Sequence, residues 1–244
     1  MNIILVSRTL SKLQTVAKEI EETFNVETAV IDVDFTSGSE IYNKIKERVK
    51  GKEIGVLVNN VGISNKAPDM FLETPDREQL IQDIIRCNIT SVSMMCSIVL
   101  PQMVQRQKGI IINISSLCAL LVSGEIALYA ASKAFVHKFT QDLTAEYEHQ
   151  GIIIQSVLPG PVATKMTNIK NGNLFATEPK SYVSSAIKTV GFAEYTTGYF
   201  PHSLMVLAAK FSFFVFPTML KNFQRKFADT IRNREIETGR YNKK

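Results

Sequence analysis

Short apolar runs alternate along the chain with longer amphipathic stretches. The apolar runs predict strands over residues 3–7, 26–31, 54–59, 109–115 and 152–157. The stretches between them predict helices over about 11–24, 39–50, 76–106 and 128–149. Each strand is almost wholly apolar, so both of its faces must be covered. This pattern predicts a parallel sheet with helices on both sides, in an α/β doubly wound domain.

Polar residues gather where the predicted strands end. They are Ser7–Arg8, Asp32–Asp34, Asn59–Gly62, Ser115–Ser116 and Pro159–Gly160. In a doubly wound domain, ligands bind beyond the carboxyl ends of the strands. The sequence therefore predicts that the functional site lies at this edge of the sheet.

The composition is that of a folded globule, with 45% hydrophobic and 21% charged residues. Three cysteines without CxxC spacing and three scattered histidines argue against a disulfide framework and against a metal site. The formal net charge of +5 is carried by residues 221–244, which hold eight basic and three acidic side chains. We therefore expect no nucleic-acid-binding body, but a basic tail that seeks an anionic surface. Because the chain opens on a strand, we expect no signal peptide.

A tyrosine and a lysine four residues apart are the first candidates for chemistry. Tyr129 and Lys133 share one helix face, and a lysine ammonium beside a phenol lowers the pKa of the phenol. Tyr42 and Lys46 have the same spacing on the charged helix over 39–50, where we expect both side chains to be solvated. Ser116 ends a buried strand thirteen residues before Tyr129, so these two hydroxyls can converge on one carbonyl oxygen.

Together, the motifs NNVG at 59–62, NISS at 113–116, YAASK at 129–133 and PG at 159–160 resemble the short-chain dehydrogenase/reductase family. The segments 53–62, 156–165, 189–191 and 197–199 resemble in particular the very-long-chain 3-oxoacyl-CoA reductases, also called 17-beta-hydroxysteroid dehydrogenases of types 12 and 3. The resemblance covers essentially the whole chain and implies a Rossmann-like sheet.

The resemblance assigns roles to individual residues. It implies that Ser116 binds the substrate carbonyl, Tyr129 donates the proton, Lys133 holds the nicotinamide ribose, and Asn88 anchors a proton-relay water. The remaining positions that it implies for cofactor binding are Asn60, Gly62, Asp34 and the loop with Pro159, Val162 and Thr164. Arg8 follows the strand at which NAD enzymes place an acid that binds the ribose 2′-hydroxyl. An arginine there suits a 2′-phosphate, which favours NADP(H) over a purely structural Arg8.

The resemblance also implies a membrane segment, a strand, a TGxxxGxG turn and a helix before Asn2. None of these patterns occurs in the 244 residues. We therefore expect a Rossmann-like sheet without its first strand, glycine-rich turn and first helix. Either a gap separates the strands at 3–7 and 54–59, or the two strands pair directly. The expected function is NADPH-dependent reduction of a 3-oxoacyl-CoA or a 17-ketosteroid. The alternative is a non-catalytic paralogue or isoform that does not bind the cofactor.

The carboxyl end differs from the rest of the chain. We expect a Rossmann-like domain over 1–202 and an apolar helix with a basic tail over 203–244. Residues 204–220 are mostly apolar but contain Lys210 and Pro217, which leaves three possibilities: a core helix, an interfacial helix and a membrane span. The tail ends in Lys243–Lys244, which resembles a dilysine retrieval signal. We expect association with the endoplasmic reticulum membrane, a catalytic domain that faces the cytosol, and a homodimer through the helices at 76–106 and 128–149.

Overall fold

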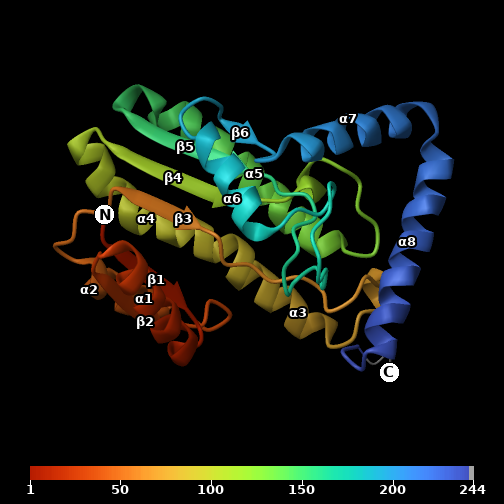
Figure 1. Ribbon diagram of the computed structural model, residues 1–244, viewed down its shortest axis with the longest axis horizontal. Helices are drawn as coiled ribbons and strands as arrows, with labels where there is room; N and C mark the ends of the chain where they lie inside the picture. The colour runs from red at the N-terminus through yellow and green to blue at the C-terminus, as the bar shows by residue number, and fades with distance from the viewer. Residues whose placement is uncertain (242–244) are drawn as a thin grey trace.

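The computed structural model describes residues 1–241 as strands joined by helices (Figure 1). The strands are β1 (Ile3–Ser7), β2 (Thr28–Asp32), β3 (Val56–Asn59), β4 (Gly109–Ile114), β5 (Ile152–Val157) and β6 (Tyr195–Thr196). The α-helices are α1 (Leu10–Phe24), α2 (Ile41–Val49), α3 (Arg77–Ile84), α4 (Ser91–Arg106), α5 (Ala127–Tyr147), α6 (Pro179–Ala186), α7 (Phe200–Val215) and α8 (Pro217–Glu237). The predicted α/β class and all five predicted strands are confirmed, and β6 is a further short strand.

All strand pairs are parallel, but they form two separate sheets. One sheet has the order β1-β2, and the other has the order β3-β4-β5-β6. Ile3 is opposite Thr28 in the first sheet, and Val56 is opposite Ile110 in the second. Among the described residues, β1 does not pair with β3. Of the two arrangements expected from the sequence, the structure therefore has the gap.

One hydrophobic core joins the two sheets through their side chains. Ile31 of β2 and Ile45 of α2 belong to the same buried cluster as Leu57 of β3 and Met103 of α4. Burial of each such aliphatic side chain contributes about 1.5–3 kcal/mol to stability. Figure 1 shows β1, β2, α1 and α2 together at one end of the molecule, with α3 and α4 running beside the larger sheet. Packing through α2 and α4 therefore takes the place of backbone pairing.

The helix predicted over about 11–24 is α1, which begins at Leu10 after Thr9 and has no side-chain cap. One local expectation is wrong. Tyr42 is not solvated. Only 3% of its surface is exposed, because its ring points from α2 into the core, where it lies beside Phe35. Its phenol therefore faces apolar side chains, and burial raises its pKa.

The carboxyl end consists of two helices that meet at Phe216 with a bend of 119°. The predicted boundary between residues 202 and 203 falls inside α7, whose His202 and Val206 are buried against the main body. In Figure 1, α7 extends away from the end of β6, and α8 turns back along the side of the molecule. The possible retrieval signal at Lys243–Lys244 lies outside the described residues.

Candidate active site

The carboxyl end of β4 and the first turns of α5 bring Ser116, Tyr129 and Lys133 together. Lys133 is buried, and its Nζ donates a hydrogen bond of 2.9 Å to the Ile114 carbonyl. The same Nζ lies 5.9 Å from the centre of the Tyr129 ring. Directly after β4, the Ser115 hydroxyl donates to the Lys133 carbonyl at 2.7 Å. These contacts fix the helix that carries tyrosine and lysine against the strand end that carries the serine.

Burial dominates the ionisation of this group. It raises the pKa of Tyr129 to about 12, with a further contribution from the Cys118 charge, while a hydrogen bond with Ser116 acts in the opposite direction. Burial also lowers the pKa of Lys133 to about 8. The predicted lowering of the tyrosine pKa by Lys133 is therefore wrong for this structure, because loss of water outweighs it. At neutral pH, Tyr129 holds its proton.

Asn88 connects the β3 loop to α5. It lies fully buried in a π-helical turn, Ile85–Thr90, between α3 and α4, where the single predicted helix over 76–106 is interrupted. Its Oδ1 accepts from the Ile63 N–H at 2.8 Å, and its Nδ2 donates to the Ile63 carbonyl and to the Ser132 hydroxyl, both at 2.9 Å. The side chain expected to hold a water is thus engaged with protein groups, and it positions the loop.

Gly62 is the point of closest approach between this loop and α5. A Cβ atom on Gly62 would lie 3.2 Å from Lys133 Nζ and 3.4 Å from Asn88 Oδ1. A side chain there would push on the lysine, so a glycine suits this position. The structure therefore brings together five of the predicted residues, namely Gly62, Asn88, Ser116, Tyr129 and Lys133.

The loop after β5 is held by a histidine that the sequence analysis did not select. His202 of α7 is fully buried, and its Nδ1 accepts a hydrogen bond from the Gly160 N–H at 3.1 Å. Its Nε2 therefore carries the proton and donates to the Phe175 carbonyl at 3.2 Å. A Cβ atom on Gly160 would lie 2.7 Å from the imidazole, so only glycine fits. The PG motif marks Gly160 in the sequence, but nothing in the sequence connects it to His202, which lies 42 residues later.

Further along the same loop, Val162 pairs with Thr177 in an isolated bridge. The Thr167 hydroxyl donates to the Val162 carbonyl at 2.6 Å and accepts from the Thr164 N–H at 3.2 Å. Pro159 begins this loop, so the segment predicted to shape the nicotinamide pocket is a structured turn.

A chain of buried polar side chains also went unrecognised. The Asn59 amide donates to Asn113 at 2.8 Å, and Asn113 donates to the Thr140 hydroxyl at 3.0 Å. This chain crosses from β3 through β4 to α5. Buried polar groups need such partners. Strand-end asparagines in apolar runs were the available signal.

Arg8 and Asp34 lie on the smaller sheet, at the carboxyl ends of β1 and β2. Their side chains form an ion pair of 3.6 Å, in which Arg8 is 70% exposed. Burial opposes ionisation of Asp34, but hydrogen bonds from Thr36 and the Arg8 charge hold its pKa below the usual value. The buried Cys87, whose pKa burial raises to about 11, interacts electrostatically with Lys133, Asp34 and Arg8. Asn60 is exposed at the end of β3.

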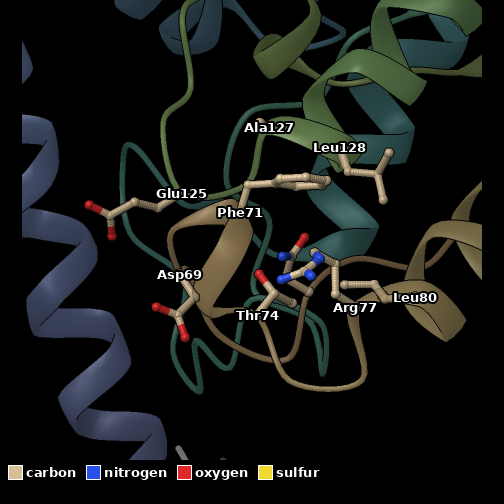
Figure 2. Close-up of a pocket in the computed structure, with 9 residues that line it drawn as sticks. Asp69, Phe71, Thr74, Arg77, Leu80, Glu125, Ala127 and Leu128 are labelled. Carbon is tan, nitrogen blue, oxygen red and sulfur yellow. The ribbon is translucent and has the colours of Figure 1, made fainter.

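A small pocket lies at the start of α5, where Ala127 and Leu128 form part of its lining (Figure 2). Its lining includes Phe71, Arg77 and Leu128, with the Arg77 guanidinium 5.7 Å from the centre of the Phe71 ring. Figure 2 shows Asp69 and Glu125 pointing away from that ring, toward α8. From α8, Arg232 binds Glu125 at 2.6 Å and Asp69 at 3.7 Å. The carboxyl-terminal helix is therefore tied to the loop that leads into Tyr129.

With this geometry in view, known proteins provide a comparison. The family model described as short chain dehydrogenase matches residues 1–173. The very-long-chain 3-oxoacyl-CoA reductase of Mus musculus is 49% identical over 205 residues, which cover 84% of this chain and 65% of that protein. The chain therefore spans about two thirds of the length of this relative.

Solved structures agree on the fold. The structure of a 7beta-hydroxysteroid dehydrogenase aligns with a TM-score of 0.77 at 24% identity, over 86% of this chain and 82% of that one. A gluconate 5-dehydrogenase from Burkholderia cenocepacia J2315, in complex with NADP and tartrate, aligns with a TM-score of 0.58 at 27% identity, over 67% and 62%. The doubly wound architecture is thus shared despite the divided sheet.

Proposed function

Because the chain belongs to the short-chain dehydrogenase family, we propose that it is an NADPH-dependent reductase of a ketone on a lipid substrate. The observation that carries this proposal is the convergence of Ser116, Tyr129 and Lys133 at the end of β4, held by bonds of 2.7–2.9 Å. The substrate is a 3-oxoacyl-CoA, as in the name of the mouse relative, and the reaction is a step of very-long-chain fatty acid elongation. A 17-ketosteroid is the second substrate class.

The positions of these side chains indicate a simple path for the proton. Tyr129, protonated at neutral pH because burial raises its pKa, donates from Oη to the ketone oxygen as that oxygen gains charge. Ser116 donates a hydrogen bond to the same oxygen and holds the carbonyl in place. Lys133 supplies a positive charge beside the phenolate that remains. NADPH, when bound, supplies the hydride.

The residues present fit the two ends of NADPH. Lys133 and the loop with Pro159, Val162 and Thr164 would hold the nicotinamide ribose and ring. Arg8, exposed at the end of β1, would bind the 2′-phosphate, and Asp34, Asn60 and Gly62 would line the adenosine side. The observation that supports this fit is the close approach of Gly62 to Lys133, which places backbone atoms and a lysine side chain at one site.

The divided sheet favours a second candidate function. Without pairing between β1 and β3 in the described chain, the Arg8 side and the Tyr129 side are connected by side-chain packing and by a hydrogen bond of 3.1 Å from Arg86 to the Thr36 carbonyl, and not by a strand ladder. A non-catalytic paralogue or isoform that does not bind the cofactor would tolerate this arrangement.

One experiment separates the two candidates. The purified chain is titrated with NADPH and with NADH by calorimetry, and oxidation of NADPH is then followed on addition of a long-chain 3-oxoacyl-CoA or a 17-ketosteroid. The reductase proposal expects NADPH binding and substrate-dependent oxidation that is lost in Tyr129→Phe. Absence of binding at millimolar NADPH would support the non-catalytic candidate.

We also propose that the protein acts at the endoplasmic reticulum membrane with its catalytic side toward the cytosol, where a very long acyl chain is held by lipid. A homodimer through α4 and α5 is the proposed assembly. Phe135 of α5, which is exposed and stacks on Phe139, supports it. Sedimentation of Phe135→Ser beside the unmodified chain tests the dimer.

A further inference from the structure

An unbroken apolar stripe runs along the outer face of α7. Its members recur at alternating steps of four and three residues, and each exposes more than half of its surface: Phe200, Leu204, Leu207, Phe211 and Phe214. Steps of four and three keep side chains on one side of a helix. On the other side of α7, His202 and Val206 are buried against the main body. The stripe therefore faces away from the protein.

The first half of α8 extends the same kind of surface. Met219, Phe223 and Phe227 are exposed at steps of four residues, and the rings of Phe223 and Phe227 stack at 6.5 Å. The opposite side of α8 is attached to the body, where Ala228 is buried and Arg232 binds Glu125 at 2.6 Å. We call the exposed residues of α7 and of α8 up to Phe227 the apolar elbow. Exposed apolar side chains gathered on two neighbouring helices mark an interaction site.

The charges around the apolar elbow identify the partner. Residues 200–228 contain no acidic side chain, and they contain four basic ones: Lys210, Lys221, Arg225 and Lys226. All four are exposed. Long basic side chains beside an apolar stripe reach anionic headgroups while the stripe enters the acyl boundary. An anionic phospholipid surface satisfies both the apolar and the charged residues.

The shape of the elbow decides how it meets the membrane. With 16 residues, α7 is roughly 24 Å long, which is shorter than a hydrocarbon core of about 30 Å. The inner side of its first turns, at His202 and Val206, is buried against the body, so lipid cannot surround the whole helix. The 119° bend at Phe216 also prevents α7 and α8 from forming one straight span. The run Arg77–Arg106 is long and apolar enough to cross a membrane, but half of the apolar 18-residue stretch within it is buried inside the protein.

We infer that the apolar elbow lies in the plane of an anionic membrane surface, with its phenylalanines at the acyl boundary and its four basic residues at the headgroups. The inference deepens the membrane location proposed above, and it is independent of catalysis. His202 connects α7 to the Gly160 loop, so the docked face lies directly behind the proposed nicotinamide pocket.

The chain contains no tryptophan, which permits a direct test. Leu207→Trp, Phe214→Trp and Phe223→Trp each introduce a single fluorophore into the elbow. Phe24→Trp, at the exposed end of α1 beside the smaller sheet, is the matched control. Each variant is mixed with phosphatidylcholine vesicles that contain or lack phosphatidylserine, and with vesicles whose lipids are brominated near the headgroup or deep in the acyl chain.

For all three elbow variants we expect a blue shift with phosphatidylserine vesicles and stronger quenching by the shallow bromines. Phe24→Trp should not respond. On the unmodified chain, vesicle flotation should weaken with added salt, and each of Lys221→Gln, Arg225→Gln and Lys226→Gln should lower partitioning roughly fivefold.

Three results would overturn the inference. Deep quenching at residue 214 with shallow quenching at 207 and 223 would mean that the segment enters the bilayer as a hairpin. A blue shift that depends on protein concentration without vesicles would mean that the elbow binds a second copy. Flotation of the unmodified chain that is absent, or that is equal with and without phosphatidylserine, would exclude recognition of anionic lipid. None of these measurements involves NADPH or an acyl-CoA, so failure of the reductase proposal would not affect them.

Discussion

The two sheets hold their functional residues in different ways. On the larger sheet, Asn88 and Lys133 are buried and bonded to backbone groups at 2.8–2.9 Å. On the smaller sheet, Arg8 and Asp34 form a 3.6 Å pair with an arginine that is 70% exposed. An exposed pair of this kind contributes about 0–1 kcal/mol. The proton-transfer groups are thus fixed by the fold. Arg8, which is proposed to bind the 2′-phosphate, instead lies exposed at the end of its strand.

This difference separates chemistry from cofactor selectivity. Preorganised groups act without rearrangement during the reaction, so their loss affects turnover or folding. An exposed arginine costs little to remove from the folded chain, so its loss affects only the ligand that it binds. Variants on the two sheets should therefore change different measurements, and each prediction below tests this division.

The largest effect is expected for Tyr129→Phe. Removal of the hydroxyl removes the proton donor, and general acid catalysis typically contributes about 10²–10⁴-fold. We expect kcat for the ketone substrate to fall by this factor while NADPH affinity stays within about twofold, because Lys133 and Arg8 remain. Tyr42→Phe makes the same change in the other YxxxK pair, away from the site, and should leave kcat unchanged. More than half of the activity in Tyr129→Phe would show that another group donates the proton.

A large loss of stability is expected for Asn88→Ala. The substitution leaves the Ile63 N–H and carbonyl without their buried partner, whereas the Ser132 hydroxyl keeps its bond of 2.7 Å to the Tyr129 carbonyl. Unsatisfied buried groups cost about 1–3 kcal/mol each, and we expect the free energy of unfolding to fall by about 2–4 kcal/mol in total after relaxation. Urea denaturation measures the free energy of unfolding. Asn60→Ala, at the exposed neighbouring loop position, should change it by less than about 0.5 kcal/mol. Equal values for the two variants would contradict a positioning role for Asn88.

The regular part of the fold was predictable because it depends on local pattern. Apolar runs such as 109–115 and 152–157 appear as β4 and β5 within a residue or so of their predicted limits. The motif around Tyr129 and Lys133 was also recognisable, because residue type and spacing carry it. The gap between β1 and β3 followed from strand order together with the patterns in these 244 residues.

The remaining features depend on contacts between distant residues. Tyr42 appears solvated in its charged helix, but α2 turns it into the core that joins the two sheets. His202 looks like part of an apolar tail, and its role depends on Gly160, which lies 42 residues earlier. The pKa of Tyr129 depends on burial, which the spacing to Lys133 does not reveal. Sequence pattern thus identifies the groups, while packing decides their ionisation and their partners.

Cofactor selectivity should respond to Arg8→Ala on the smaller sheet. A charge-assisted contact with a 2′-phosphate is worth about 1.5–3 kcal/mol, so NADPH affinity should fall roughly tenfold to a hundredfold. NADH affinity and the free energy of unfolding should stay nearly constant, because Arg8 is exposed and its pair with Asp34 is weak. Calorimetric titration with both cofactors gives the comparison. An equal loss for NADPH and NADH would mean that Arg8 supports the strand end rather than the phosphate.

The smallest expected effect lies in the pH dependence of stability on the larger sheet. Burial holds the Lys133 pKa at about 8, below the value of 10.5 for a solvated lysine. Between these values the unfolded chain binds a proton that the folded chain does not, so stability rises as pH rises. From pH 8 to 10 this amounts to about 2 kcal/mol. Lys133→Met removes the contribution. The folded chain keeps Tyr129, Cys87 and Cys96 protonated across this range, because burial raises their pKa to about 12, 11 and 12. The difference in unfolding free energy between Lys133→Met and the unmodified chain, measured in urea across this range, should therefore shrink with pH. A constant difference would show that Lys133 is solvated, and that the larger sheet does not hold its charged group in the way proposed here.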